Sequence, residues 1–184
     1  ADDVLHKLFL IQPYAIVAGG APRDWLDGKL ATDVDVFVDT RHINTAKKER
    51  VLFAVAGLLR FEKGEGRDWD DIPEHYKKNP NIKRVYNLEI DGVAVQLICV
   101  KCPCWDVVEQ FPIPICQAWY KNGRIGTTLE YKLCKKVGAL VITNHVYGMQ
   151  DKFIKKISEK FPPPRFNWYS TMEHVKRGIY PQES

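Results

Sequence analysis

Apolar positions along the 184-residue chain change between strand-like and helix-like spacing. Short apolar runs bounded by glycine, proline or acidic residues predict strands, whereas apolar residues three and four apart predict amphipathic helices. The predicted strands cover residues 14–18, 34–38, 83–90 and 93–100, with a further edge strand over 115–120. The predicted helices cover residues 2–11, 21–26, 45–59, 129–137 and 149–160, with a last short helix over 169–178. This mixture predicts an α+β fold with a mixed sheet.

The most specific local signal is a β-hairpin over residues 83–100. Its two apolar runs meet at Asp91-Gly92, a dipeptide that favours a tight turn between antiparallel strands. The preceding segment, residues 63–81, combines glycines and prolines with many charged residues, so we expect a long loop there. Pro162-Pro163-Pro164 predicts a stiff spacer near the end of the chain.

The composition is that of a folded domain. Hydrophobic residues make up 45% of the chain and charged residues 27%, which is enough for one well-filled core. No apolar run approaches the length of a membrane span, and the acidic first residues do not resemble a signal peptide. We therefore expect a cytoplasmic protein with no membrane partner. The net charge of +4 is compatible with a polyanionic partner but does not require one.

The five cysteines allow two interpretations. Cys99, Cys102 and Cys104 are close in sequence and could bind zinc, with Cys116 and His145 recruited from further along the chain. They lack a regular second ligand pair, however, and Cys99 lies in an apolar run, where a small buried thiol is common. An odd number of cysteines in no regular framework indicates reduced thiols. We therefore favour a structural role for these thiols over a zinc site.

Two acidic residues stand at the start of the strand predicted over 34–38. Side chains alternate along a strand, so Asp33 and Asp35 project from one face and Val34 from the other. Adjacent carboxylates repel each other, and a divalent cation relieves that repulsion. Mg²⁺ prefers a few carboxylate oxygens together with water and phosphate oxygens. Taken alone, such a pair is more often an ordinary solvated start of a strand.

A glycine pair precedes these acids, between the first predicted strand and the helix over 21–26. Gly19 and Gly20 allow the backbone to approach a ligand closely, and the start of a helix favours anions. A phosphate-binding turn beside two carboxylates is what metal-assisted nucleotidyl transfer requires. The two features together therefore say more than either does alone.

Both features belong to one string with fixed spacing. From Gly19 to Asp35 the chain reads G-G-x-x-R-D-x-L-x-G-x-x-x-x-D-x-D. This string resembles the head motif of the tRNA CCA-adding enzymes and bacterial poly(A) polymerases, members of the nucleotidyltransferase superfamily that includes DNA polymerase β. The positions in register are Gly19, Gly20, Arg23, Asp24, Leu26, Gly28, Asp33 and Asp35. The chain resembles a stand-alone catalytic head of the kind found in phages and large DNA viruses.

The resemblance implies a nucleotidyltransferase fold, in which a mixed sheet is flanked by helices and followed by a small helical C-terminal part. Residues 1–125 would form the catalytic core, and residues 126–184 a helical extension packed on it as one compact unit.

The resemblance also implies roles for the motif residues. Gly19 and Gly20 would hold the triphosphate through backbone N–H groups. Asp33 and Asp35 would coordinate two Mg²⁺ or Mn²⁺ ions, one activating the attacking hydroxyl and the other stabilising the leaving pyrophosphate. Arg23 would contact phosphate or ribose, or pair with an acidic residue of the site. The neighbouring Asp24 could equally brace the motif or touch the substrate.

The chain departs from the family pattern in two places. Many superfamily members have a third carboxylate on a neighbouring central strand, and the matching position here is Gln96, whose carbonyl can bind a metal weakly but cannot act as a base. Glu89, Asp91 and Asp106 are alternative sources of a carboxylate. We also find no later Arg-Arg-Asp element and no long helical domains in these residues, so specificity for tRNA is not implied.

Basic residues in the helix predicted over 149–160 suggest a second contact with substrate. Lys152, Lys155, Lys156 and Lys160 follow helical spacing, and aromatic residues lie between and after them. Interleaved cations and aromatic rings can bind a nucleic acid strand. The alternative is the solvated basic face of an amphipathic helix.

Two functions from different classes follow. The first is an enzyme that transfers a nucleoside monophosphate from an NTP to a hydroxyl of RNA, a small molecule or a protein, and releases pyrophosphate. The second is a binding or regulatory module that kept the fold and lost turnover. Gln96 favours the second, whereas the intact Gly19-Gly20 and Asp33/Asp35 set favours the first, because an inactive relative has no chemical need for two repelling acids. We therefore expect an enzyme that binds NTP.

Overall fold

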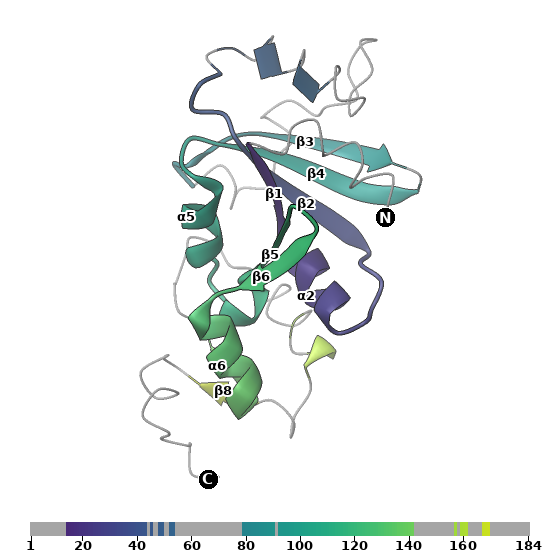
Figure 1. Cartoon of the computed structure of the whole chain (residues 1–184), viewed down its shortest axis with the longest axis vertical. Coiled ribbons are helices and arrows are strands. Elements are labelled where there is room, and N and C mark those ends of the chain that lie inside the picture. Colours follow the sequence, from purple (N-terminus) through teal and green to yellow (C-terminus); the bar gives the residue numbers. More distant parts are fainter. Residues whose placement is uncertain are drawn as a thin grey trace.

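The computed structural model describes residues 14–43, 45, 48–49, 52–53, 79–90, 92–141, 157, 159–161 and 167–169. These residues form a six-stranded mixed sheet with the order β3-β4-β2-β1-β5-β6 (Figure 1). Its strands are β1 (Ala15–Ala18), β2 (Asp33–Asp39), β3 (Ile82–Ile90), β4 (Val93–Val100), β5 (Ala118–Lys121) and β6 (Arg124–Thr127). The helices with defined bounds are α2 (Gly20–Leu26), α5 (Cys104–Glu109), the 3₁₀ helix η2 (Pro114–Cys116) and α6 (Leu129–Val137). A separate parallel pair consists of β7 (Ala139–Val141) and β8 (Asn167–Tyr169).

The sheet is mixed because β2 runs parallel to β4, whereas the other neighbouring strands of the sheet pair antiparallel. β2 and β1 occupy the two central positions. β1 ends where the motif starts, and β2 begins where the motif ends, with α2 between them. The motif therefore lies in the middle of the sheet.

The two faces of the sheet are covered by different helices. Val36 of β2 packs in a core cluster with Ala21 of α2, whereas the next residue, Phe37, packs with Val107 of α5 in another cluster. Figure 1 shows α2 and α5 on opposite sides of the central strands. We refer to these two sides as the α2 face and the α5 face. A further cluster lies under α6 and contains Ile113, Ile115, Cys116, Ala118, Tyr131, Cys134, Val141, Ile157 and Phe161.

The predicted β-hairpin is confirmed as β3 and β4, which pair in register from Ile90 and Val93 onward. The predicted edge strand over 115–120 is wrong in two respects. Residues 114–116 form η2, because Pro114 suits the first turn of a helix and cannot donate to a ladder. β5 then lies inside the sheet, between β1 and β6.

The β5–β6 hairpin was not predicted, although a local signal for it exists. Asn122 and Gly123 both have positive φ angles, 53° and 75°, which a tight turn between right-twisted strands requires. Trp119 packs over Gly126 in the opposite strand, where a Cβ would lie 2.4 Å from the indole ring. This hairpin makes β1 an interior strand.

The helix predicted over 129–137 is confirmed with the same bounds as α6. The Thr128 side chain accepts a hydrogen bond from the Tyr131 N–H at 3.1 Å, which caps its start. Gly138 ends it in the left-handed conformation, with φ 65°. The short helix predicted over 21–26 is confirmed as α2. The short helix α5 over 104–109 was not predicted.

Other predictions are tested only in part. Residues 48–49, 52–53, 157 and 159–160 are helical, within the helices predicted over 45–59 and 149–160. Tyr169 lies in β8 rather than at the start of a helix, because it pairs with Val141. The predictions for residues 2–11, for most of the loop over 63–81, for Pro162-Pro163-Pro164 and for residues 170–178 lie outside the described residues. No helix in the described part is long and apolar enough to cross a membrane.

Buried Glu49 holds the helical residues 48–49 against the edge strand β3. Its side chain is fully buried and lies 2.5 Å from the Lys83 ammonium group. The Tyr86 hydroxyl donates to the same carboxylate at 3.3 Å. A register shift between Ile82 and Arg84 lets Lys83 reach this carboxylate from β3. The charge on Glu49 is therefore compensated inside the α2 face.

Candidate functional site

Asp33 and Asp35 lie on the α5 face at the start of β2. They alternate with Val34 and Val36, which are buried in the α2 face, and they share their side of the sheet with Phe37. Asp33 is exposed and accepts a hydrogen bond from the Thr32 hydroxyl at 3.1 Å, whereas Asp35 is partly buried. The structure thus brings the two predicted carboxylates together on one face.

Gln96 lies directly beside Asp35, because the parallel register pairs these two residues across β2 and β4. Paired residues in neighbouring strands project from the same face of a sheet. The Gln96 side-chain amide donates to the Asn87 side-chain oxygen at 2.8 Å, and Asn87 is its register partner in β3. Asp35, Gln96 and Asn87 thus form one polar row across three strands. This is the placement expected for Gln96; its role as a metal ligand stays a prediction.

The alternative carboxylates do not lie in this row. Glu89 pairs with Ala94, which pairs in turn with Asp33, so Glu89 stands in the next row on the edge strand. Asp106 belongs to α5, where its charge acts on Arg41 and Cys102. Asp91 lies outside the described residues. Within the described part of the chain, no three histidine, cysteine, aspartate or glutamate side chains are grouped to hold a metal ion.

Gly19 lies against Asp35. A Cβ at this position would lie 3.8 Å from the Asp35 Oδ2 atom and 3.7 Å from the Phe111 ring, and the φ angle of 91° strongly favours glycine. The Gly19 N–H donates to the Ala118 carbonyl at 2.9 Å. The predicted role of this N–H in holding a triphosphate is therefore not available in this conformation. A Cβ at Gly19 would be in ordinary van der Waals contact with Asp35 and Phe111, so the positive φ angle is what favours glycine here.

Arg23 is buried, with 3% of its surface exposed. Its Nε donates to Asp24 Oδ1 at 2.8 Å and its Nη1 to the Cys116 sulfur at 3.3 Å. The Phe161 ring lies 5.5 Å from the guanidinium carbon. Of the two roles predicted for Arg23, the structure shows the pairing with an acidic residue. Asp24 is the partner of this guanidinium, and its role in the motif stays a prediction.

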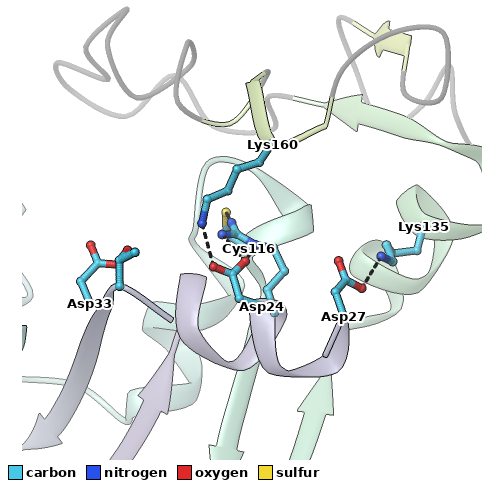
Figure 2. A network of polar contacts seen from close by, with 8 residues as sticks. Asp24, Asp27, Asp33, Cys116, Lys135 and Lys160 are labelled. Carbon is cyan, nitrogen blue, oxygen red and sulfur yellow. Dashed lines mark hydrogen bonds and ion pairs between the residues drawn. The ribbon is translucent and has the colours of Figure 1, made fainter. Parts of the chain in front are cut away.

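The charge of Asp24 is stabilised by hydrogen bonds. Burial alone would raise the pKa of its carboxyl, but hydrogen bonds from Lys160 and Arg23 outweigh that effect and lower the pKa below its ordinary value of 3.8. Figure 2 shows Lys160 reaching Asp24 from the C-terminal segment, and Lys135 of α6 reaching Asp27 at the end of α2. Two ion pairs therefore join α2 to later parts of the chain.

The three clustered cysteines do not converge on one point. Cys99 is buried in the cluster of the α2 face, whereas Cys104 is buried in that of the α5 face. The Cys104 thiol donates to the Phe37 carbonyl at 3.4 Å. The sheet separates the two sulfurs, which fits the structural role favoured from the sequence.

Lys152, Lys155 and Lys156, the predicted nucleic-acid contacts, lie outside the described residues. The structure shows two sets of contacts that were not predicted from the sequence. Asn87 is the partner of Gln96, and the Arg23–Asp24 pair contacts Cys116, Lys160 and Phe161. Cys116, Lys160 and Phe161 come from distant parts of the chain, so no local pattern could have placed them beside Arg23 and Asp24. Asn87 lies nine residues before Gln96 in the predicted hairpin, so counting back from the Asp91-Gly92 turn could have identified it.

Comparison with known proteins identifies solved structures of similar fold. A Thermotoga maritima CCA-adding enzyme complexed with tRNA superposes with a TM-score of 0.60 at 16% identity, over 95% of this chain and 41% of that one. A complex of a CCA-adding enzyme with ATP gives a TM-score of 0.59 at 16% identity, over 95% of this chain and 40% of that one. A tRNA-processing enzyme gives 0.57 at 12% identity, over 97% and 46% of the two chains.

The likeness establishes the fold. The chain is an α+β protein whose mixed sheet and flanking helices match those of the CCA-adding enzymes, and the predicted fold class is confirmed. It spans less than half the length of these enzymes. No protein-family model and no curated protein sequence matches it. Nothing in these comparisons supports a viral or phage source.

Proposed function

We propose that this protein is a metal-dependent nucleotidyltransferase, which transfers a nucleoside monophosphate from an NTP to a hydroxyl acceptor and releases pyrophosphate. The observation that carries this proposal is the placement of Asp33 and Asp35 on one face of the central strand, with Gly19 directly against Asp35. A fold that matches that of CCA-adding enzymes supports it. Mg²⁺ or Mn²⁺ is the expected metal, since the donors are hard oxygens.

The residues around the carboxylates fit such a metal. Asp33 and Asp35 supply the charged oxygens, and Thr32 orients Asp33 through its hydroxyl. Because Gly19 has no side chain, its backbone lies close to Asp35, and a phosphate group bound to the metal could approach this backbone. Two bound divalent ions would supply activation of the attacking hydroxyl and stabilisation of the leaving pyrophosphate. The contribution of the chain is to fix both carboxylates on a rigid central strand.

Gln96 makes the proposed site less negative than one with a third carboxylate. Its amide occupies the position beside Asp35, and Asn87 fixes the orientation of that amide through the 2.8 Å hydrogen bond. A neutral amide attracts a divalent cation less strongly than a carboxylate does. We therefore expect weaker metal binding than Gln96→Glu would show.

RNA is the acceptor class that we propose first. The similar structures include an enzyme complexed with tRNA, and others complexed with ATP and with CTP. The net charge of +4 is compatible with a polyanionic acceptor. In the same proposal, the acceptor contacts Lys152, Lys155 and Lys156. The proposal also includes a cytoplasmic location, and a division into a core over 1–125 and an extension over 126–184.

A transfer assay tests this function. The protein would be incubated with each α-labelled NTP, Mg²⁺ or Mn²⁺, and pooled RNA or a cell lysate, and the labelled products would be separated by size. We expect label in an acceptor with the wild type and none with Asp35→Asn. Lys135→Met is the matched control, since it removes a charge from an exposed ion pair away from the carboxylates. Label in no acceptor with any NTP and either metal would overturn the proposal.

A second candidate function is a binding or regulatory module of the same fold without turnover. The observation that favours it is Gln96 at the position beside Asp35. A module of this kind would bind NTP or a partner without forming pyrophosphate. Transfer of label to an acceptor in the assay above therefore separates the two functions.

A further inference from the structure

The glycine turn of the proposed site rests on a buried charged group. A Cβ added at Gly20 would lie 3.5 Å from the Arg23 Nη2 atom, so the guanidinium packs against the backbone of the turn. The same group contacts Asp24, Cys116 and the Phe161 ring, and these contacts fix its plane. The guanidinium therefore supports the turn from the Gly20 side, while the hydrogen bond from the Gly19 N–H to the Ala118 carbonyl holds its first residue.

Asp24 connects this guanidinium to the C-terminal segment. Its Oδ1 atom lies 2.7 Å from Arg23 Nη2, and its Oδ2 atom accepts a hydrogen bond from Lys160 at 2.7 Å (Figure 2). Lys160 is 136 positions further along the chain. Both carboxylate oxygens are thus engaged, one by the helix that follows the turn and the other by a distant residue.

The network is sensitive to the loss of one member. Arg23 and Asp24 are 3% and 6% exposed, and a buried ion pair recovers its desolvation cost only when its remaining oxygens and protons are also hydrogen-bonded. Lys160 supplies the hydrogen bond that Arg23 cannot, because Arg23 occupies the other oxygen. Lys160 is itself about one-third exposed, so replacing it disturbs the core less than replacing Arg23 or Asp24.

We propose that Lys160, together with Phe161, is a positioning residue for the nucleotide site, which acts through Asp24 and Arg23 to hold the Gly19–Gly20 turn against Asp35. This inference rests on the proposed function, because it gives that turn a role in NTP binding. It makes the C-terminal segment part of the site, although the carboxylates and the turn belong to the first 35 residues. Lys160 acts on the turn rather than on the reacting atoms.

The chain provides a matched control. Lys135 of α6 also forms an ion pair with α2, at 2.8 Å to Asp27. Asp27 follows the last turn of α2, whereas Asp24 contacts the arginine beneath the glycine turn. Lys135→Met and Lys160→Met therefore remove the same charge and one contact with the same helix, but only the second disturbs Arg23.

The experiment measures ATP binding by calorimetry in Mg²⁺ for the wild type, Lys160→Met, Lys160→Arg and Lys135→Met. Misplacing a binding group by a small distance can cost orders of magnitude, so we expect Lys160→Met to bind roughly tenfold more weakly or worse. Lys160→Arg keeps the charge and should recover most of the affinity. Lys135→Met should bind within about twofold of the wild type, since exposed ion pairs contribute little.

Hydrogen exchange of the backbone amides in residues 18–24 gives a second readout. Exchange there should be faster in Lys160→Met than in Lys135→Met, at a temperature where both variants are folded. Wild-type ATP affinity in Lys160→Met, or equal losses in both lysine variants, would overturn the positioning role and leave the proposed function intact. The wild type is titrated in the same way with CTP, GTP and UTP. Binding of none of the four NTPs would overturn the proposed function, and exchange rates in residues 18–24 would then decide whether Lys160 holds the turn.

Discussion

At the scale of single residues, the proposed site depends on the absence of a side chain at Gly19 as well as on the carboxylates of Asp33 and Asp35. Gly19 has a φ angle of 91°, and the atoms nearest to its missing Cβ are those of Phe111 and Asp35. Backbone strain at such a position has a cost for any other residue, and a methyl group would also occupy the space beside the carboxylate. The two effects can be separated by comparison with another glycine.

Gly19→Ala should destabilise the protein by roughly 1–3 kcal/mol and also weaken NTP binding. Gly28→Ala is the control, because Gly28 also has a positive φ, 68°, but a Cβ there meets nothing within 4 Å. Gly28→Ala should therefore lower the free energy of unfolding without changing NTP affinity. Urea unfolding and calorimetry on both variants measure the two quantities. Equal effects of both variants on NTP affinity would contradict the role of Gly19.

The thiols give a second prediction for single residues. Cys99, Cys104, Cys116 and Cys134 are buried, whereas Cys102 is partly exposed. Burial raises the pKa of the Cys104 and Cys134 thiols to about 12, which suppresses the reactive thiolate. The native protein should therefore show one faster thiol toward a disulfide reagent and four slow ones, and Cys102→Ser should remove the faster phase. Two or more equally fast thiols would contradict the packing.

At the scale of elements, the β5–β6 hairpin protects the central strand β1 from becoming an edge. Its two strands approach closely because Gly126 leaves room for the Trp119 ring. Gly126→Ala would place a methyl group 2.4 Å from that ring, and such overpacking costs about 1–3 kcal/mol.

The test is chemical denaturation of Gly126→Ala, with Trp119→Leu and the double variant. In the double variant the smaller side chain admits the added methyl group, so the two free-energy changes should not add. Strict additivity would show that the indole and Gly126 are not in contact.

The elements that the sequence predicted are those with local signals. β1, α2 and β2 follow from apolar runs and the glycine pair, and the β3–β4 hairpin from its turn dipeptide. The β5–β6 hairpin was not predicted, although Asn122-Gly123 favours such a turn, because Pro112 and Pro114 before it are typical of an edge strand. The pairing of β7 with β8 joins residues 139–141 to 167–169, and no local pattern encodes a contact at that separation.

The candidate site shows the same division. The placement of Asp33, Asp35 and Gln96 on one face could be predicted, since strand alternation and the hairpin position fix it. The burial of Arg23 could not, because its partners Cys116 and Phe161 come from the later half of the chain.

At the scale of the whole molecule, the ion pair between Lys160 and Asp24 joins the motif to the C-terminal segment and predicts an acid response. Burial alone would raise the pKa of Asp24, but hydrogen bonds from Lys160 and Arg23 lower it below 3.8. A lowered pKa in the folded state stabilises the protein above the unfolded value, and this stabilisation is lost as the pH falls through the folded value.

Lys160→Met removes one of these hydrogen bonds, so the pKa of folded Asp24 should rise. The acid-unfolding midpoint of this variant should therefore move to higher pH than that of the wild type. Lys135→Met should leave the midpoint nearly unchanged. Circular dichroism between pH 6 and pH 2 measures it, and identical midpoints for all three proteins would contradict the strength assigned to the Lys160–Asp24 contact.

In the proposed function, Asp33 and Asp35 bind the metal that a nucleotide requires. The most direct measurement is calorimetric titration of ATP into the wild type and Asp35→Asn, each with Mg²⁺ and with a chelator. We expect the wild type to bind ATP only with Mg²⁺, because a triphosphate beside two carboxylates otherwise meets like charge. Asp35→Asn should remain folded and lose most of the Mg²⁺-dependent affinity. Equally tight binding by the wild type in Mg²⁺ and in chelator, unchanged in Asp35→Asn, would contradict the account.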